Sequence, residues 1–387
     1  MTDLNASDRF DALRPYHDDE VVGVLDRLAR NHEFIDTIAR YKLPTLARRL
    51  PGLARWITQI GLRHRMKGTH TIADFQQHIA DYMYDMIDKT VTRLETRGAE
   101  HLTSGQSYLY IGNHRDISLD PAFVNLSLHR LGEDTVRIAI GDNLLEKPYA
   151  SDLMRLNKSF IVPRSSSGKR EMLKAFQLLS EYIHHSLNAD HHSIWLAQRQ
   201  GRAKNGIDRT DAGIIKMLCL AQNKRPIAEI VKELRIVPVS ISYEYDPCAI
   251  QKARELYATE TLGKYEKLAL EDMRSIATGI TGHKGRVSLS FGTVLDCQAD
   301  GSPFETVDDV VREIDRQVLA DYTLYPTHML ALEALGEHGD LVDTSIITPA
   351  DRTRFDKALA KVPSELRPWW LQQYANPVLN KAGRLAE

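Results

Sequence analysis

The sequence predicts an α/β protein with a mostly parallel central sheet flanked by helices, together with an N-terminal helical region and C-terminal helices. Between residues 107 and 295, short apolar runs such as SYLYIGN, VRIAIGD and SFIVPR alternate with segments of helical periodicity. Strands that alternate with helices are joined by crossover connections, which make neighbouring strands parallel. The two ends of the chain repeat apolar residues mainly at helical spacing. We therefore expect an N-terminal helical region (1–98), an α/β domain (99–300) and a C-terminal helical extension (301–387).

The N-terminal region is expected to contain several helices. Thr71 and Asp74 have the spacing of a helix start, and the amphipathic segment 75–98 is predicted to follow as one helix. Before it, residues 43–67 combine leucine, isoleucine and Trp56 with several arginines and no acidic residue. This composition is typical of a helix that lies on a membrane surface. Packing against neighbouring helices explains the apolar residues equally well, and two prolines divide the segment.

Composition and charge exclude several classes of protein. The net charge is −2, so no overall basicity attracts nucleic acid. The three cysteines are far apart and form no metal-ligand pattern, which indicates a reducing compartment without disulfides or zinc. Apolar runs are much shorter than the roughly 18 residues of a transmembrane helix, and the polar N-terminal segment is unlike a signal peptide. We therefore expect a cytoplasmic protein that contacts the inner face of the membrane only peripherally.

The segment GNHRDISLDPA carries the first candidate catalytic residues. His114 is predicted to lie on the turn after a strand, where open α/β sheets bind ligands. Asp120 precedes Pro121, a pattern typical of a helix N-cap followed by proline. A loop that folds back would let Asp120 orient His114 and stabilise its imidazolium, as in a general base. Asp116 is an alternative partner, and an ordinary loop histidine beside a capping residue fits this stretch equally well.

Two further loops at predicted strand ends are basic. Arg164 follows the strand SFIV, while Gly201, Arg202 and Lys204 follow the strand IWLA. Cations and backbone N–H groups near a helix start favour a phosphate. Each loop by itself is explained more simply as solvated surface. Parallel strands end at a common edge of their sheet, however, and this favours one anion site built from both loops.

In their order, these segments resemble four blocks of the glycerolipid acyltransferase superfamily, which includes glycerol-3-phosphate and 1-acylglycerol-3-phosphate acyltransferases. The matching segments are Asn113-His114 with Asp120, Phe160 to Arg164, Gly201-Arg202 with Lys204, and Ile236 to Val239. The first and second blocks each contain one residue more than the superfamily patterns N-H-x4-D and F-I-x-R. In the third, Gln200 stands where many members have glutamate, and this leaves the acceptor alcohol open.

The resemblance implies an O-acyltransferase of phospholipid biosynthesis. It implies that His114, oriented by Asp120, removes a proton from the hydroxyl of glycerol-3-phosphate or a lysophospholipid. The alkoxide then attacks acyl-CoA or an acyl carrier protein thioester, while backbone N–H groups stabilise the oxyanion. No metal or cofactor other than this acyl donor is implied, and no nucleic acid. The substrate phosphate would be held by residues of the second and third blocks: Arg164, Gly201, Arg202 and Lys204.

Other functions remain open for the same sequence. The acceptor could be a lipid without glycerol, or water could replace the alcohol, as in a thioester hydrolase. A non-catalytic homologue that only binds lipid or membrane is a different class of function. The His114 and Asp120 pair favours an enzyme, because a protein without catalysis has no need of it.

Overall fold

The computed structural model describes residues 9–145, 147–164, 168–268, 270–336 and 340–385. The chain divides into two compact units, and each joins segments that are distant in sequence. The first unit comprises Met1–Tyr82 and Arg137–Leu179, and the second comprises Met83–Val136 and Ser180–Glu387. None of the helices in the described residues combines the length and apolarity needed to span a membrane.

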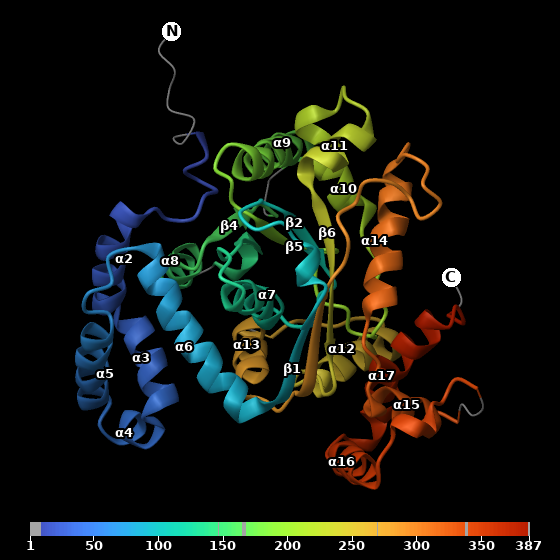
Figure 1. Ribbon diagram of the computed structural model, residues 1–387. Helices are drawn as coiled ribbons and strands as arrows, with labels where there is room; N and C mark the ends of the chain where they lie inside the picture. The colour runs from blue at the N-terminus through green and yellow to red at the C-terminus, as the bar shows by residue number, and fades with distance from the viewer. Residues whose placement is uncertain (1–8, 146, 165–167, 269, 337–339, 386–387) are drawn as a thin grey trace. The chain divides into compact units, whose positions relative to one another are not determined.

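The first unit is a group of helices with a pair of parallel strands. Figure 1 shows α2, α3 and α5 side by side, and side chains from α2, α3, α6 and α8 form a common apolar core. The strands β3 and β4 pair in parallel, as the sequence predicts. The elements that begin in this unit are α2 (Asp18–Arg30), α3 (His32–Lys42), α4 (Pro44–Arg49), α5 (Pro51–Arg65), α6 (Ile72–Thr90), β3 (Arg137–Gly141), η2 (Asp142–Leu144), α8 (Pro148–Leu156), β4 (Ser159–Val162) and α9 (Lys169–Asn188).

The start of α6 is confirmed, but its end is not where the sequence predicts it. The Thr71 hydroxyl accepts a hydrogen bond from the Asp74 N–H, and the Asp74 carboxylate accepts one from the Thr71 N–H, which is the reciprocal pattern of a capping box. The predicted helix 75–98 ends at Thr90, and Val91–Arg97 forms strand β1. Parallel pairing with β7 explains the difference, because tertiary strand pairing overrides weak local helical periodicity.

The second unit contains a five-stranded run of sheet in the order β1-β7-β6-β2-β5. All neighbours are parallel except β6 and β7, which run antiparallel. The prediction of an α/β fold with a mostly parallel sheet is therefore confirmed. The strands are β1 (Val91–Arg97), β2 (Leu109–Gly112), β5 (Ile194–Ala197), β6 (Ile236–Tyr243) and β7 (Gly285–Phe291).

Helices cover this sheet and extend from it. The rings of Phe123 on α7 and Tyr243 on β6 lie 6.1 Å apart, so α7 packs on the sheet, and α14 runs beside β6 (Figure 1). The C-terminal helices share an apolar core with α12 around Trp370 and Tyr374. The helices are η1 (Ala99–His101), α7 (Leu119–Arg130), α10 (Ala212–Cys219), η3 (Leu220–Gln222), α11 (Ile227–Leu234), α12 (Ala249–Leu262), α13 (Glu271–Thr281), α14 (Val307–Asp321), α15 (Pro326–Ala334), η4 (Thr344–Ile346), α16 (Pro349–Leu359), η5 (Ser364–Leu366) and α17 (Arg367–Lys381).

Gly98 ends β1 rather than a helix. Its φ angle is +76°, and a Cβ atom at this position would lie 1.9 Å from the carbonyl oxygen of Phe291. Only glycine avoids both the steric cost of positive φ and this close approach. The chain can therefore turn away from β1 beside the end of β7.

Candidate active site

His114 lies in the loop between β2 and α7, at the carboxyl end of a central strand. Its Nδ1 atom is 2.9 Å from Oδ2 of Asp120, which is within the expected range for an orienting pair. Asp120 is fully buried, and the His114 side chain is 12% exposed. The Nε2 atom has no hydrogen-bond partner among the described residues. The imidazole is therefore held at one nitrogen, and its second nitrogen remains to accept a proton.

The two aspartates in this loop do not have the roles that the sequence predicts. α7 begins at Leu119, so Asp120 lies inside its first turn and is not the N-cap. It is Asp116 whose Oδ1 accepts hydrogen bonds from the N–H groups of Ser118 and Leu119, at 3.0 and 2.9 Å. Burial raises the pKa of the Asp116 carboxyl, and the nearby charge of Asp120 raises it further. The prediction that Asp120 caps the helix was wrong, because Asp116 makes these bonds.

Asp120 instead accepts hydrogen bonds from several residues of the loop and from β6. Its Oδ2 atom accepts the backbone N–H groups of Arg115 and Asp116, at 2.6 and 2.9 Å, as well as the bond from His114. Its Oδ1 atom accepts a bond from the hydroxyl of Tyr243, at 2.8 Å. Four donors therefore converge on one buried carboxylate. Asp120 therefore fixes both the backbone of the loop and the ring of His114.

The residue before His114 is anchored to β6. The side-chain amide of Asn113 accepts a hydrogen bond from the N–H of Ile241 at 2.7 Å and donates one to its carbonyl oxygen at 3.0 Å. The same amide donates to Asp208 at 3.1 Å. The carbonyl oxygen of His114 accepts the N–H of Ala203 at 2.8 Å. The loop that carries His114 is thus held by the strand of the fourth block and by the loop of the third.

The residue after His114 is anchored by buried charges. The Arg115 guanidinium donates to Asp208 at 2.5 Å and to the carbonyl oxygen of Gly206 at 3.1 Å. Burial favours neutral arginine, but the charges of Asp208, Tyr322 and Asp246 and the hydrogen bond to Asp208 together outweigh it and raise the pKa of Arg115. The Arg115 carbonyl oxygen accepts a bond from Lys252 at 2.7 Å, and Lys252 also pairs with Asp246. These buried pairs set the backbone on both sides of the histidine.

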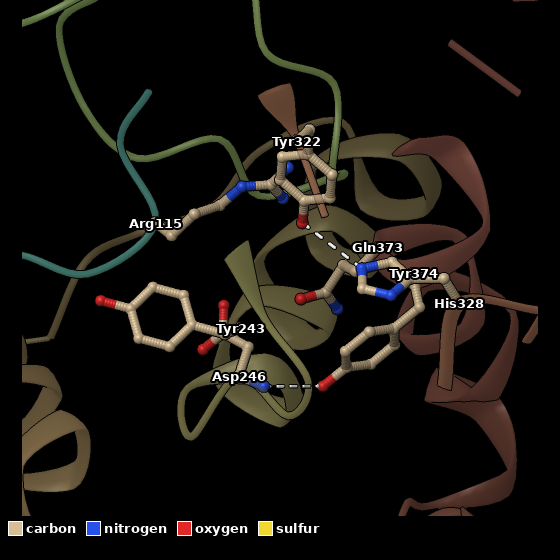
Figure 2. Close-up of a pocket in the computed structure, with 7 residues that line it drawn as sticks. All are labelled: Arg115, Tyr243, Asp246, Tyr322, His328, Gln373 and Tyr374. Carbon is tan, nitrogen blue, oxygen red and sulfur yellow. Dashed lines mark hydrogen bonds between the residues drawn. The ribbon is translucent and has the colours of Figure 1, made fainter. Parts of the chain in front are cut away.

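A small polar cavity lies behind this loop. Figure 2 shows Arg115 beside the ring of Tyr322, and the distance from the guanidinium carbon to the ring centroid is 5.2 Å. The cavity has about 10 Å³ of space, which suits roughly one water molecule rather than a substrate. The residues around it support the loop, and the cavity itself is too small to be the reaction pocket. Its lining residues are Arg115, Tyr243, Asp246, Tyr322, His328, Gln373 and Tyr374.

Trp195 forms a wall of the site beside His114. The two rings meet edge to face with 5.8 Å between their centroids. A Cβ atom at Gly112 would lie 3.1 Å from the indole nitrogen. The glycine before the N-H motif thus gives the indole room to pack against the strand end and limit the movement of the imidazole.

The basic residues of the third block take different positions. Lys204 is paired with Glu255 of α12. Arg202 is half-buried and donates to the Ser275 hydroxyl at 3.4 Å, while its Nη1 atom is buried without a hydrogen-bond partner among the described residues. Gly201 is exposed with a φ of +75°, so it serves the turn of the chain. Arg202 is therefore the better placed of the two cations to bind an anion.

Arg164 belongs to the first unit. It is exposed, its backbone N–H donates to Asp142 at 3.0 Å and its guanidinium donates to Asn143 at 3.2 Å. Both partners follow β3, so the loops after β3 and β4 are joined by Arg164. A role of Arg164 in phosphate binding stays a prediction.

The sequence did not single out Tyr243, Arg115 or Asp208. Val239, Ile241 and Tyr243 are spaced two positions apart, which indicates that they share one face of β6. No local pattern links Tyr243 to Asp120. Arg115 and Asp208 are separated by more than ninety positions. Across the described residues, no group of three or more histidine, cysteine or acidic side chains is arranged to hold a metal ion.

Part of the chain is similar in sequence to known acyltransferases. Residues 93–242 match the family model described as Acyltransferase, a range that includes the pair of His114 and Asp120. The predicted resemblance to acyltransferases is thereby confirmed for this part of the chain. Among solved structures, the 1-acyl-sn-glycerophosphate (LPA) acyltransferase PlsC from Thermotoga maritima is similar, with 11% identity and a TM-score of 0.37 over 80% of this chain and 98% of that chain. No curated protein sequence matches the chain.

Proposed function

We propose that this chain, which has an acyltransferase domain at residues 93–242, transfers a fatty acyl group from a thioester to the hydroxyl of a phosphate-bearing glycerolipid precursor. The donor would be acyl-CoA or acyl carrier protein, and the acceptor glycerol-3-phosphate or a lysophospholipid. One observation carries the proposal: Asp120, with four donors around it, holds Nδ1 of His114 at 2.9 Å. Such an arrangement orients a general base and stabilises the imidazolium that it forms.

In the proposed reaction, Nε2 of His114 takes the proton of the acceptor hydroxyl. The hydroxyl oxygen attacks the thioester carbon and the tetrahedral intermediate collapses. The C–S bond breaks, and the leaving thiolate takes up the proton from the imidazolium of His114. Backbone N–H groups in the loop after β5 are candidates for stabilising the oxyanion. The N–H of Ala203 is not one of them, because it is already bonded to the carbonyl oxygen of His114.

The acceptor phosphate is assigned mainly to Arg202. A buried guanidinium N–H without a partner in the protein costs free energy unless a ligand satisfies it, and Nη1 of Arg202 is in this situation. Lys204 is a weaker candidate, since Glu255 already neutralises it. Arg164 is retained in the proposal on the resemblance alone. The reaction calls for no metal or further cofactor.

The test is product analysis with purified protein. Isotope-labelled acyl-CoA and acyl carrier protein thioesters are each incubated with glycerol-3-phosphate, a lysophosphatidic acid, a lysophospholipid and a hydroxylated lipid without glycerol, and products are identified by mass spectrometry. We expect a labelled ester with one of the first three, and His114→Ala should lower the rate about 10²–10⁴-fold without unfolding the protein. Free fatty acid without any ester would indicate a hydrolase. Lipid binding without turnover would indicate a non-catalytic homologue.

Peripheral membrane binding is the second part of the proposal, and α5 supports it. Leu53, Trp56, Ile57 and Ile60 follow helical spacing, yet they are 43%, 59%, 39% and 49% exposed. On α5 the only buried residue is Ala54. A stripe of exposed apolar side chains with exposed arginines nearby suits a bilayer surface. We propose that α4 and α5 place the protein on the inner, anionic face of the cytoplasmic membrane.

The arginines around this stripe are not equivalent. Arg55 makes two hydrogen bonds to Asp36, at 2.7 and 2.6 Å, so its charge is already compensated within the protein. Arg48, Arg49 and Arg63 are exposed, and none of them has an ion pair with another described residue. Near an anionic surface each such cation contributes about 1 kcal/mol. These three arginines are therefore suitable residues to change.

Vesicle flotation tests the membrane surface. Changing Arg48, Arg49 and Arg63 together to Glu should lower partition onto anionic vesicles by about 100-fold or more. The control changes three exposed lysines elsewhere to Glu and should float like the wild type: Lys224, Lys357 and Lys361. Equal flotation of the arginine variant and the wild type would exclude this surface as the anchor. Equal loss in both variants would mean that overall charge, rather than this surface, governs binding.

A further inference from the structure

We propose that Tyr243 is a positioning residue for the reaction: its hydroxyl fixes the rotation of the Asp120 carboxylate, and through it the ring of His114. The inference rests on the proposed acyl transfer with His114 as base, and it assigns to that site a residue of β6, the strand that contains the fourth block. No motif in the sequence links Tyr243 to the two residues, which lie more than a hundred positions away.

The partners of Asp120 are divided unequally between its two oxygens. Oδ2 accepts three hydrogen bonds, from the ring of His114 and from the backbone N–H groups of Arg115 and Asp116. Oδ1 accepts one, from Tyr243 at 2.8 Å. Without the hydroxyl, a buried carboxylate oxygen would lose the one partner that Oδ1 has among the described residues. The carboxylate could then rotate, and the direction of its bond to His114 would change.

Tyr243 is itself held in a position from which its hydroxyl donates a hydrogen bond to Asp120. The residue is 4% exposed, and its ring packs against Phe123 of α7. Burial and the charge of Asp120 raise the pKa of Tyr243 well above its usual value, so the hydroxyl keeps its proton. Figure 2 shows this hydroxyl pointing away from Tyr322, His328 and Tyr374, which line the small cavity. It is therefore available to Asp120 and not to the network behind the loop.

The strand that carries Tyr243 also holds the residue before His114. The same strand holds Asn113, the residue before His114, through both backbone groups of Ile241. Ile241 and Tyr243 are two positions apart on β6 and so share one face of the strand. β6 thus fixes the backbone on one side of His114 and, through Asp120, the ring itself. A rigid strand gives a more constant geometry to such a site than a loop does.

The test compares Tyr243→Phe with Tyr108→Phe. Both remove a buried phenolic hydroxyl, and Tyr108, which is 3% exposed, bonds to Thr103 and Gln106 at the opposite end of β2 from His114. We expect kcat of Tyr243→Phe to fall between about threefold and thirtyfold, with KM changed less than about twofold, because the lost interaction strengthens in the transition state. The kcat of Tyr108→Phe should stay within about twofold of wild type. Equal kcat values for both variants and the wild type would overturn the inference.

Two further measurements separate positioning from general destabilisation. If Tyr243 acts through Asp120, adding Tyr243→Phe to Asp120→Asn should cost less than about twofold more in kcat, whereas independent effects would multiply. Multiplying losses contradict the inference. In ¹⁵N-histidine-labelled protein, the low-field Nδ1–H resonance of His114, assigned by its absence in His114→Ala, should move in Tyr243→Phe and stay in Tyr108→Phe. An unchanged resonance in Tyr243→Phe also contradicts it.

Failure of the inference differs from failure of the proposed function. If the wild type makes no ester with any acceptor, acyl transfer itself is wrong, while the resonance still reports whether Tyr243 affects the ring of His114. If the wild type is active and His114→Ala is not, a fully active Tyr243→Phe rejects only the positioning role. Tyr243→Phe should fold, since phenylalanine retains the ring that packs on Phe123. Circular dichroism and thermal unfolding check that each variant is folded.

Discussion

Asp120→Asn isolates the charge of the orienting carboxylate from its shape. The amide oxygen can take the place of Oδ2, where three N–H donors converge, and the amide nitrogen can face the Tyr243 hydroxyl, which is able to accept. The loop should therefore keep its conformation. What disappears is the negative charge beside the imidazolium of His114.

The size of the effect follows from these contacts. Charge-assisted hydrogen bonds are roughly twice as strong as neutral ones, so weakening the bonds to the buried Asp120 should cost about 2–3 kcal/mol of stability. The catalytic loss should be larger, about 10³–10⁴-fold in kcat, because an uncompensated imidazolium must form in the transition state. Asp116→Asn is the matched control, since the Asp116 carboxylate lies in the same loop but accepts the N–H groups of Ser118 and Leu119 and no bond from His114.

Initial rates of ester formation, measured by mass spectrometry at saturating acceptor, give kcat for each variant. Thermal unfolding of the same samples checks that the protein is folded at the assay temperature. Asp116→Asn should retain kcat within about threefold of wild type, since its bonds to N–H groups can be kept by an amide oxygen. The reasoning is refuted if Asp120→Asn keeps more than a tenth of wild-type activity, or if Asp116→Asn is impaired equally.

Two further predictions concern the phosphate site and the buried cavity. Arg202→Ala should raise KM for a phosphate-bearing acceptor about 10–100-fold, which is the effect of losing a hydrogen bond to a charged group. Lys204→Ala should change this KM less than about threefold, because Lys204 pairs with Glu255. Similar KM values for the two variants in steady-state kinetics would reject the assignment of the phosphate to Arg202. Burial lowers the pKa of His328 to about 3 from 6.5, so the folded protein takes up fewer protons than the unfolded chain. The contribution of His328 to the free energy of unfolding is then complete above about pH 6.5 and falls by about 1.4 kcal/mol per pH unit below it. His328→Asn should therefore flatten the pH dependence of stability in urea unfolding between pH 7 and 5, and parallel slopes for the variant and the wild type would contradict the shift.

The alternating pattern of strands and helices was sufficient to predict the fold class. The predicted strands at 107–113, 236–245 and 285–295 appear as β2, β6 and β7, because short apolar runs of β-branched and aromatic residues form buried strands. The pattern failed at 91–97, where Val91 and two threonines follow an amphipathic helix without a break in periodicity. That segment became a strand through pairing with β7, a partner almost two hundred residues away.

The sequence also identified His114 and the candidate acids, but not their roles. Local spacing made Asp120 a helix cap and left Asp116 as an alternative partner. The folded loop reverses the first role, because its N–H groups converge on Asp120 while Asp116 bonds to the start of α7. Such convergence depends on the backbone path of the whole loop, which residue types at fixed spacing do not specify.

What the sequence by itself determined is therefore the kind of fold and the candidate base, since periodicity and motif order are local properties. The tertiary structure decided which acid meets His114 and that Tyr243 of β6 supports it. It also decided that the apolar stripe around Trp56 faces outward, although the same spacing usually marks a buried face. Helical spacing places apolar side chains on one face of a helix. Only the packing of distant segments determines whether that face is covered by protein or left exposed.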